Sequence, residues 1–320
     1  MLGRIETAWQ GQMNNKVRGT LEMSVAMAIS GTIGWCVVRS GLPIVDLIFW
    51  RCVFGAATLA PVCAALGMLR RDRWSWRLVG LASLGGVAIV ANWLLIFASY
   101  SHASISIATA VYNTQPFMLV GLGALFLGER LTATKLLWLV VAFAGMLLIV
   151  QAEPAAGLHG QQASGAHDYL AGILMALGAA FFYALAAFIT KKLAGTPPHL
   201  IALVQVCVGI VIVAPAVNFA TLPSLTDDLP AWGTLVAMGV IYTGLVYILL
   251  YGAIQKLPTT LTGALSFIYP VVAIGVDYAA FGQRLQAAQI AGAAAILVAA
   301  AGMTLGWSWP GPKAAVNEVS

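Results

Sequence analysis

The chain has 320 residues, of which 61% are hydrophobic and only 8% are charged, and its mean hydropathy is +0.91. A soluble domain carries about 25% charged residues, so this composition excludes a soluble protein and indicates one that crosses a membrane many times. The formal net charge of +5 is modest and gives no reason to expect a nucleic-acid partner.

Ten apolar segments are long enough to cross a bilayer, which takes roughly 20 helical residues. The first eighteen residues are too polar for a signal peptide, so we expect the first span to be retained as an anchor. The predicted spans are residues 19–38, 45–67, 77–99, 104–127, 132–151, 169–192, 199–217, 231–254, 259–281 and 286–307. The sequence therefore predicts an all-α polytopic membrane protein.

Lysine and arginine residues gather on alternate connections between these spans. With the N-terminus in the cytoplasm, the outer segments contain only Arg39 and Arg284, and the connections 152–168 and 218–230 contain neither residue type. Cytoplasmic loops of membrane proteins carry an excess of these basic residues. We therefore expect a multi-pass protein of the cell (plasma or inner) membrane with both termini in the cytoplasm.

The two halves of the chain repeat one pattern. Pro116 lies twelve residues before Gly128-Glu129-Arg130-Leu131, and Pro270 lies twelve residues before Gly282-Gln283-Arg284-Leu285, an offset of 154 residues in both cases. Five spans per half is an odd number, so the halves form two inverted five-helix repeats, an arrangement typical of alternating-access transporters. The predicted division is a cytoplasmic segment at 1–18, repeats at 19–151 and 169–307, an external linker at 152–168 and a cytoplasmic tail at 308–320.

Over roughly residues 19 to 307 the chain resembles the EamA-type module of the drug/metabolite transporter superfamily. The resemblance rests on the motifs above, on the opening Gly31-Thr32-Ile33-Gly34-Trp35, on Arg51, and on Gly145-Met146-Leu147-Leu148 and Gly302-Met303-Thr304-Leu305. Gln283 departs from the glutamate that the pattern prefers. The resemblance implies ten helices, a central cavity lined mainly by spans one to four and six to nine, and peripheral fifth and tenth spans. It leaves the substrate open, because members export amino acids, sugars, vitamins, nucleotide derivatives and drugs.

Polar and aromatic residues inside the spans mark a candidate substrate path. Polar groups are expensive in a bilayer, so they usually face a cavity or another helix. The candidates are Trp35, Arg51, Asn92, Trp93, Tyr112, Asn113, Gln115, Thr243, Tyr247, Ser266 and Tyr269. Hydrogen bonding or packing between helices is the alternative role for each of them.

Pro116 and Pro270 predict a helix kink at matching positions of the two halves. Proline removes a backbone donor and clashes with the carbonyl four residues back, so both helices should bend there. A static bend that serves packing alone is the alternative. The matching positions favour a bend that both halves use in function.

Ionisable residues inside the spans offer two further roles. Glu22 and Asp277 are candidates for coupling transport to protons, although either could also extend to the membrane surface. Arg51 could hold a substrate carboxylate through its planar guanidinium, or it could pair with Asp46 or Asp277. No acidic residue sits at the centre of a span.

The sequence lacks the motifs of several other classes of function. The sequence contains no metal-ligand spacing, nucleotide-binding loop or catalytic cluster, so we expect no metal, no cofactor and no enzyme activity. A secondary transporter is favoured, exporting hydrophobic or aromatic amino acids or related small metabolites. The alternatives are a proton-coupled exporter of cationic drugs and, less favoured, a membrane-embedded enzyme. The expected partners are a small-molecule substrate and the lipid bilayer. Substrate, direction, coupling ion and oligomeric state stay open, with a monomer as the simplest assembly.

The orientation leads to a labelling prediction. In a variant without its four native cysteines, Gly160→Cys should react with an impermeant maleimide in intact cells, because 152–168 is expected outside. Ser75→Cys, in the basic connection 70–77, should react only after the cells are opened. The reverse pattern would overturn the orientation.

Overall fold

The computed structural model describes residues 2–33, 36, 43–70, 74–100, 102–103, 105–152, 166–218, 229–281 and 286–307, and within these ranges every regular element is a helix. The α-helices are α1 (Leu2–Gly31), α3 (Ile44–Ala65), α4 (Trp76–Ser99), α5 (Ile105–Tyr112), α6 (Gln115–Leu127), α7 (Ala133–Ala152), α8 (Ala166–Lys192), α9 (Pro198–Val213), α10 (Leu229–Gly239), α11 (Val246–Lys256), α12 (Thr259–Ser266), α13 (Ile268–Phe281) and α14 (Ala287–Leu305). A short 3₁₀ turn, η2 (Ala214–Ala216), follows α9, and a π-helical segment, η4 (Val240–Leu245), joins α10 to α11.

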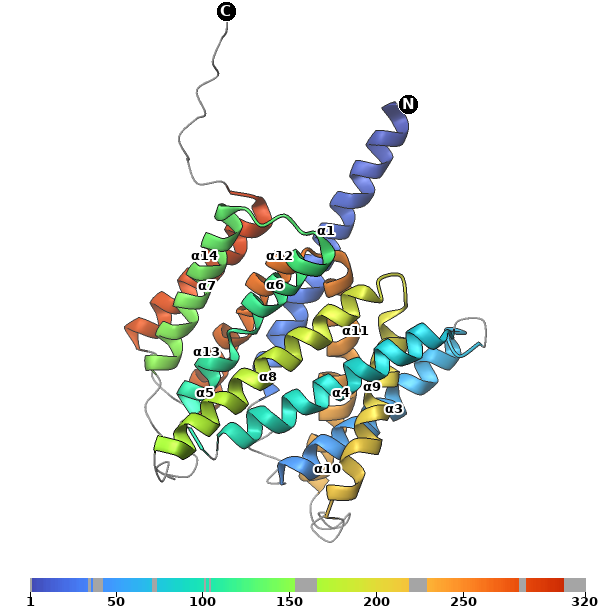
Figure 1. Ribbon diagram of the computed structural model, residues 1–320, viewed down its shortest axis with the longest axis vertical. Helices are drawn as coiled ribbons and strands as arrows, with labels where there is room; N and C mark the ends of the chain where they lie inside the picture. Colours follow the sequence, from blue (N-terminus) through green and yellow to red (C-terminus); the bar gives the residue numbers. More distant parts are fainter. Residues whose placement is uncertain are drawn as a thin grey trace, which may run out of the picture.

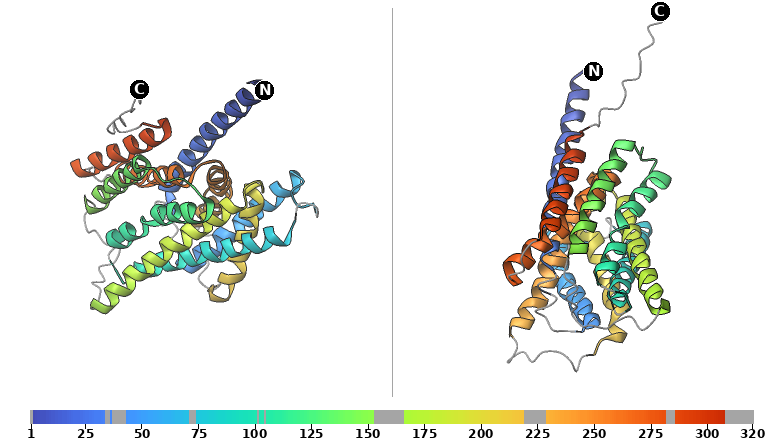
Figure 2. Two further views of the ribbon diagram at one scale, coloured as in Figure 1. Left: turned by 45° about the horizontal axis from the view of Figure 1, so that its top comes forward. Right: turned by 90° about the vertical axis from the view of Figure 1, so that its left-hand side faces the viewer.

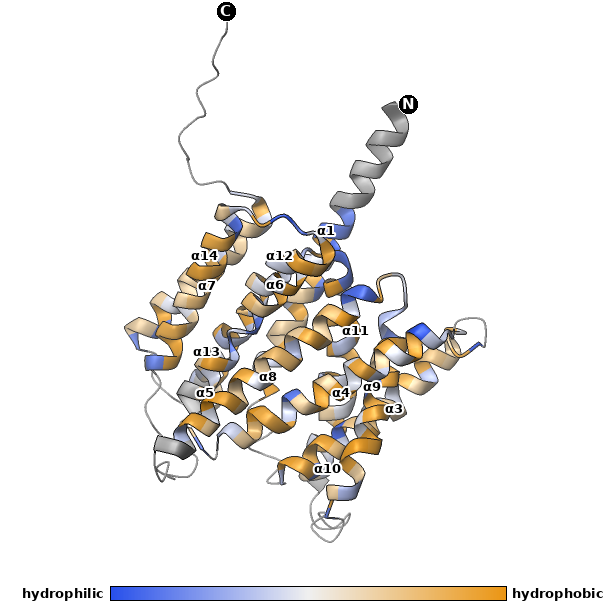
Figure 3. Ribbon diagram, in the orientation of Figure 1, coloured by the Kyte–Doolittle hydropathy of each residue, from blue (hydrophilic) through white to orange (hydrophobic). Residues whose placement is uncertain are grey.

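The helices confirm a polytopic membrane protein. Nine helical segments of the described residues are long and apolar enough to cross a bilayer, and they correspond to the second to tenth predicted spans. The first predicted span, 19–38, falls on the second half of α1 and continues beyond the described residues. Large apolar side chains such as Leu125, which is 78% exposed, and Val211, which is 73% exposed, suit contact with lipid. Hydrophobic residues predominate along most of the helices (Figure 3).

Both ends of the described chain lie at one end of the bundle. Helix α1 begins there and α14 ends there (Figures 1 and 2). The Lys16 ammonium donates a hydrogen bond of 2.7 Å to the Thr304 carbonyl, which ties the two helices together. We call this end the terminal face and the other end the far face. An even number of membrane crossings places both ends of a chain on the same side.

The two halves of the chain interleave. Helix α4 packs on α8, and its counterpart in the second half, α11, packs on α1. Helices α3 and α9, α6 and α12, and α7 and α14 pair with their own counterparts. These contacts between the halves therefore match when the halves are exchanged, as expected for a duplicated unit. Helices α7 and α14 lie together at one side of the bundle (Figure 1).

Two glycines allow α7 and α14 to approach closely. A Cβ atom added to Gly145 would lie 2.6 Å from the Gly292 carbonyl oxygen, and one added to Gly292 would lie 2.4 Å from the Gly145 carbonyl oxygen. Backbone atoms cannot move away as a flexible side chain can. The pair is therefore a small-residue contact of the kind that brings membrane helices together.

The contact predicts that Gly145→Ala and Gly292→Ala each lower stability by about 1–3 kcal/mol, because the added methyl group forces the helices apart. Thermal unfolding in detergent measures the change. Gly121→Ala is the matched control, since a Cβ atom there meets nothing within 4 Å. Equal melting temperatures in all three variants would show that α7 and α14 do not rely on this approach.

Candidate functional site

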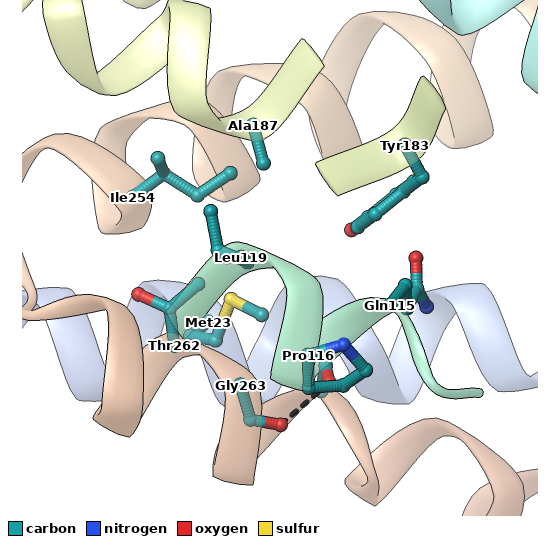
Figure 4. A pocket seen from close by; sticks show the side chains of 10 residues that line it. Met23, Gln115, Pro116, Leu119, Tyr183, Ala187, Ile254, Thr262 and Gly263 are labelled. Carbon is teal, nitrogen blue, oxygen red and sulfur yellow. Dashed lines mark hydrogen bonds between the residues drawn. The ribbon is translucent and has the colours of Figure 1, made fainter. Parts of the chain in front are cut away.

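A narrow cavity lies between the two halves of the chain, beside the gap between α5 and α6. Its empty space of about 250 Å³ includes space open to the surroundings, and the cavity has room for about one water molecule. Helices α1 and α6 from the first half and α8, α11 and α12 from the second contribute its walls (Figure 4). The lining residues are Met23, Gln115, Pro116, Leu119, Tyr183, Ala187, Ile254, Thr262, Gly263 and Ser266. We call this space the central cavity.

One polar group of the central cavity lacks a partner. The Gln115 side-chain oxygen is buried and makes no hydrogen bond with any described residue. Tyr183 extends from α8 toward the same space (Figure 4). The hydroxyls of Thr262 and Ser266 instead donate to carbonyls of their own chain segment, those of Pro258 at 3.1 Å and Gly263 at 2.6 Å. Gln115 is therefore the acceptor that a ligand in the cavity would meet.

Helix interruptions create this part of the cavity wall. Helix α5 ends at Tyr112 and α6 begins at Gln115, with Pro116 in its first turn. Helix α12 likewise ends at Ser266 and α13 begins at Ile268, two residues before Pro270. The structure interrupts the regular helix at both places where kinks are predicted, over Asn113 and Thr114 in one span and at Phe267 in the other. Each proline lies in the first turn of the following helix, where its missing N–H is not needed.

Two clusters of charged residues lie between the central cavity and the terminal face. In the first, the Glu22 carboxylate accepts hydrogen bonds from Arg18 Nε at 2.9 Å and from Lys256 Nζ at 2.5 Å. The Lys256 ammonium also donates to the Gly252 carbonyl at 3.2 Å. This cluster joins α1 to α11. Glu22 thus makes two ion pairs, and it is not among the residues that line the cavity.

The second cluster joins the ends of α6 and α8 to the start of α12. The Glu129 carboxylate lies 2.9 Å from Lys191 Nζ and accepts hydrogen bonds from the Thr259 backbone N–H at 2.8 Å and hydroxyl at 2.7 Å. Thr259 is the first residue of α12, so the carboxylate also caps that helix. Lys191 Nζ donates in addition to the Leu257 carbonyl. The repeated Gly-Glu-Arg-Leu motif therefore supplies a structural ion pair in the first half.

Both clusters close the central cavity on the terminal side. Along α8, Lys191 follows the cavity residue Ala187 by one turn, and along α11, Lys256 follows Ile254 by two residues. Both helices end toward the terminal face (Figure 1). A solute in the cavity would have to separate these ion pairs to leave on that side.

Arg51 of α3 lies on the other side of the central cavity and is only 9% exposed. Its Nε donates to the Thr243 hydroxyl at 2.8 Å and its Nη2 to the Tyr242 carbonyl at 3.2 Å. Both partners belong to η4, and π-helical turns are often found at functional sites. The guanidinium carbon lies 4.4 Å from the centre of the Trp93 ring and 5.8 Å from that of Tyr247.

Residues of α11 connect Arg51 to the central cavity. Ile254 lines the cavity, Tyr251 lies one turn away, and Tyr247 lies two turns away, a rise of about 10 Å. The rings of Tyr247 and Tyr251 are 5.1 Å apart, and the Tyr251 hydroxyl donates to the Gln205 side chain. Two buried tyrosine rings in contact therefore lie between the cavity and Arg51.

An open cavity lies beyond Arg51. It encloses about 630 Å³, including space open to the surroundings, and its walls come from α1, η4 and α13. Its lining residues are Thr32, Tyr242, Val276, Ala279 and Ala280. The Tyr242 hydroxyl lies 2.6 Å from the Thr32 hydroxyl, whereas its backbone carbonyl accepts the hydrogen bond from Arg51. Tyr242 therefore separates Arg51 from the open cavity, which lies near the ends of α1 and α13 at the far face.

Several predicted path residues make contacts elsewhere. The Asn92 amide donates to the Ala179 carbonyl of α8 at 2.9 Å, and the Asn113 amide donates to the Thr109 carbonyl one turn back at 2.8 Å. Neither lines the central cavity. Asn92 thus fits the alternative of hydrogen bonding between helices, and Asn113 makes its bond within the α5 segment.

Most of the other predicted residues lie either at the central cavity or around Arg51. Gln115, Pro116 and Ser266 line the central cavity, and Trp93, Thr243 and Tyr247 surround Arg51. Three predicted residues line neither cavity: Tyr112, Tyr269 and Pro270. The Tyr112 ring contacts the Tyr183 ring, with ring centres 6.3 Å apart. Trp35 and the Asp277 side chain lie outside the described residues.

Two features of the site were not anticipated from the sequence: the partners of Arg51 and the position of Tyr183. Arg51 forms no ion pair with Asp46, whose carboxylate accepts a hydrogen bond from the Asn218 backbone at 3.1 Å. Tyr183 was absent from the predicted path. Its position in the middle of the span 169–192 was the available signal, because tyrosines that only anchor a helix lie near span ends.

Comparison with known proteins agrees with this architecture. The model of the EamA-like transporter family matches residues 19–151 and 170–305. A transporter of Bacillus subtilis named YxxF, described as uncharacterized, is 30% identical over 290 residues, which cover 91% of this chain and 89% of that protein. A solved crystal structure superposes with a TM-score of 0.75 at 22% identity, over 90% of this chain and 96% of the other, and shows the same fold.

Two relatives with more specific names match less of the chain. A probable amino-acid metabolite efflux pump of Salmonella typhimurium is 25% identical over 60% of this chain and 64% of its own length. A riboflavin transporter of Brucella anthropi is 28% identical over 40% of this chain and 44% of its own length. The chain belongs to the EamA-like transporter family, and its relatives are named as transporters rather than enzymes.

The Glu129 cluster predicts a specific dependence of stability on pH. Burial alone would raise the pKa of Glu129, but hydrogen bonds from Lys191 and Thr259 outweigh it and hold the pKa below its ordinary value of 4.5. The cluster therefore stabilises the folded state fully above about pH 4.5, and this stabilisation is lost as the pH falls through the lower, folded pKa.

Glu129→Gln should accordingly lower stability by about 1–3 kcal/mol at neutral pH, and the difference from the wild type should shrink below about pH 4.5. Thermal unfolding in detergent across this range measures both effects. Arg130→Gln, at the exposed neighbouring position, is the control and should leave the pH dependence unchanged. A difference that stays constant with pH would exclude a charged Glu129 from the cluster.

Proposed function

We propose that the protein is a secondary transporter that exports amino acids with hydrophobic or aromatic side chains by alternating access. The observation that carries this proposal is the central cavity, which both halves build beside two interrupted helices. It is closed by ion pairs toward the terminal face, and two buried tyrosine rings lie between it and Arg51, on the side of an open cavity near the far face. An occluded site with one closed and one more open side suits a transport cycle.

The chemistry of the path supports this class of substrate. The central cavity presents aliphatic side chains, one aromatic ring and a few amide and hydroxyl groups, and no acidic side chain lines it. Trp93 and Tyr247 add aromatic rings beside Arg51. Aromatic walls favour a flat or hydrophobic side chain. The unpaired Gln115 oxygen would accept a hydrogen bond from a substrate amino group. The name of the Salmonella relative points in the same direction.

The direction of transport follows from the expected orientation. If the terminal face is cytoplasmic, the structure is closed to the cytoplasm, and the open cavity lies on the outer side. The cycle would load substrate when the two ion-pair clusters separate and release it near the far face. No nucleotide-binding motif is present in the sequence, so a solute or ion gradient would supply the energy.

The alternative, proton-coupled export of cationic drugs, is less well supported. It needs an acidic residue that meets the substrate and carries a proton. Glu22 is held between Arg18 and Lys256 instead, and no acidic residue lines the central cavity. The cell membrane as the location and the monomer as the working unit are likewise part of the proposal.

Transport into proteoliposomes tests the proposed substrate. Phenylalanine and leucine should exchange across the membrane, whereas tetraphenylphosphonium should not. Gln115→Leu should weaken exchange about 2- to 12-fold, because one hydrogen bond of about 0.5–1.5 kcal/mol is lost.

Ser24→Ala is the control, because Ser24 is the neighbour of the cavity residue Met23 on α1 but does not line the central cavity. It should exchange phenylalanine at the wild-type rate. Exchange of the cation without the amino acids would favour the multidrug alternative. Equal exchange by Gln115→Leu and the wild type would remove Gln115 from the site.

A further inference from the structure

Arg51 is a buried cation with no acidic partner among the side chains that the structure describes. It is 9% exposed, and no carboxylate of the described residues lies within 4.0 Å of it. Its hydrogen bonds go to two uncharged oxygens, the Thr243 hydroxyl and the Tyr242 carbonyl. A charge removed from water is stable in a protein only when it is well compensated. Among the described residues, the compensation comes from neutral groups.

The guanidinium retains a free donor group. Nε and Nη2 are occupied, and Nη1 makes no hydrogen bond with any described residue. Planar guanidinium groups bind carboxylates with two parallel hydrogen bonds, and the pair Nη1 and Nη2 offers this geometry once the 3.2 Å bond to the Tyr242 carbonyl yields. The neutral partners on η4 therefore fix the position of the guanidinium but do not neutralise its charge, which remains available to an anion.

The surroundings of Arg51 select the rest of the ligand. The Trp93 ring lies 4.4 Å from the guanidinium carbon, and the edge-to-face pair of Trp93 and Tyr247 has ring centres 6.3 Å apart. Cation–π contacts stabilise the charge in part and orient the guanidinium plane. An anion at this place would carry a hydrophobic or aromatic group against the same rings.

We propose that Arg51 is the residue that recognises a carboxylate on the substrate, and that the transporter selects aromatic or hydrophobic carboxylates. This inference rests on the proposed transport function and specifies its substrate. Arg51 lies about two helical turns from the central cavity and next to Tyr242, which lines the open cavity. The carboxylate would bind beside Arg51, and the amino group of an amino acid, which is attached to the neighbouring carbon, would not reach Gln115 from this position.

Matched ligand pairs test this recognition on the purified, full-length protein. Each pair differs only in the carboxylate: phenylalanine with phenylalaninamide, and phenylacetate with phenylacetamide. The acids should raise the melting temperature of the wild type in a concentration-dependent way, and the amides should not. Binding of the acids should be at least tenfold weaker in Arg51→Lys, which keeps the charge but loses the planar donor pair, and absent in Arg51→Leu.

Control variants separate recognition from structure. Arg77→Leu removes an exposed arginine at the start of α4 and should bind the acids as the wild type does. A purely structural Arg51 would lower the melting temperature when replaced, yet leave the preference for acids over amides unchanged. Arg51→Lys keeps the buried charge and serves as the readout where Arg51→Leu yields too little folded protein.

The outcomes distinguish this inference from the proposed function. Phenylacetate binding that depends on Arg51, without amino-acid exchange in proteoliposomes, would support carboxylate recognition and overturn the amino-acid substrate. Amino-acid exchange that is less than twofold weaker in Arg51→Lys than in the wild type would support the amino-acid substrate and overturn carboxylate recognition by Arg51. Absence of any difference between acids and amides in the wild type would overturn the role of Arg51.

Discussion

Polar groups inside the bilayer must find partners within the protein, and for four of them in this chain a partner comes from the other half. Arg51 of α3 donates to η4, Asn92 of α4 donates to α8, Glu22 of α1 pairs with α11, and Glu129 binds α12. Apolar packing gives no net hydrophobic drive between helices in lipid, so these directional contacts and close approaches hold the halves together. Any movement of one half against the other must therefore exchange hydrogen bonds.

The two sides of the central cavity are closed with unequal strength. Toward the terminal face lie full ion pairs, Glu22 with Lys256 and Glu129 with Lys191. Toward the far face, the described contacts of charged groups are with neutral partners, Arg51 with Thr243 and Tyr242 and Asp46 with the Asn218 backbone. At the open cavity the contact is between the Thr32 and Tyr242 hydroxyls, at 2.6 Å. Hydrogen bonds between charged groups are roughly twice as strong as neutral ones. This difference favours the state that is closed at the terminal face, and the Glu129 motif of the first half contributes directly to it.

The sequence contained enough information for the architecture and for part of the site. Hydrophobic length located the spans, and the matching prolines located the interrupted helices, because both signals are local. The partner of Arg51 was not predictable in the same way: Asp46 is near in sequence, but Thr243 and Trp93 are near in space. Asn113 was expected on the path, yet its amide satisfies the Thr109 carbonyl one turn back. Whether an amide faces a cavity or a backbone group depends on tertiary packing.

The π-helical segment η4 links the features that sequence patterns could not reveal. A π turn places one extra residue in a helix, and here consecutive residues face different neighbours. The Thr243 hydroxyl accepts from Arg51 and donates to the Met238 carbonyl at 2.9 Å, five residues back. The Tyr242 side chain lines the open cavity and its carbonyl holds Arg51. A change of η4 toward regular α-helix would shift both residues together. The guanidinium and the wall of the open cavity are thus mechanically coupled, so an anion that draws Arg51 away from the Tyr242 carbonyl acts on the same segment that borders the far face.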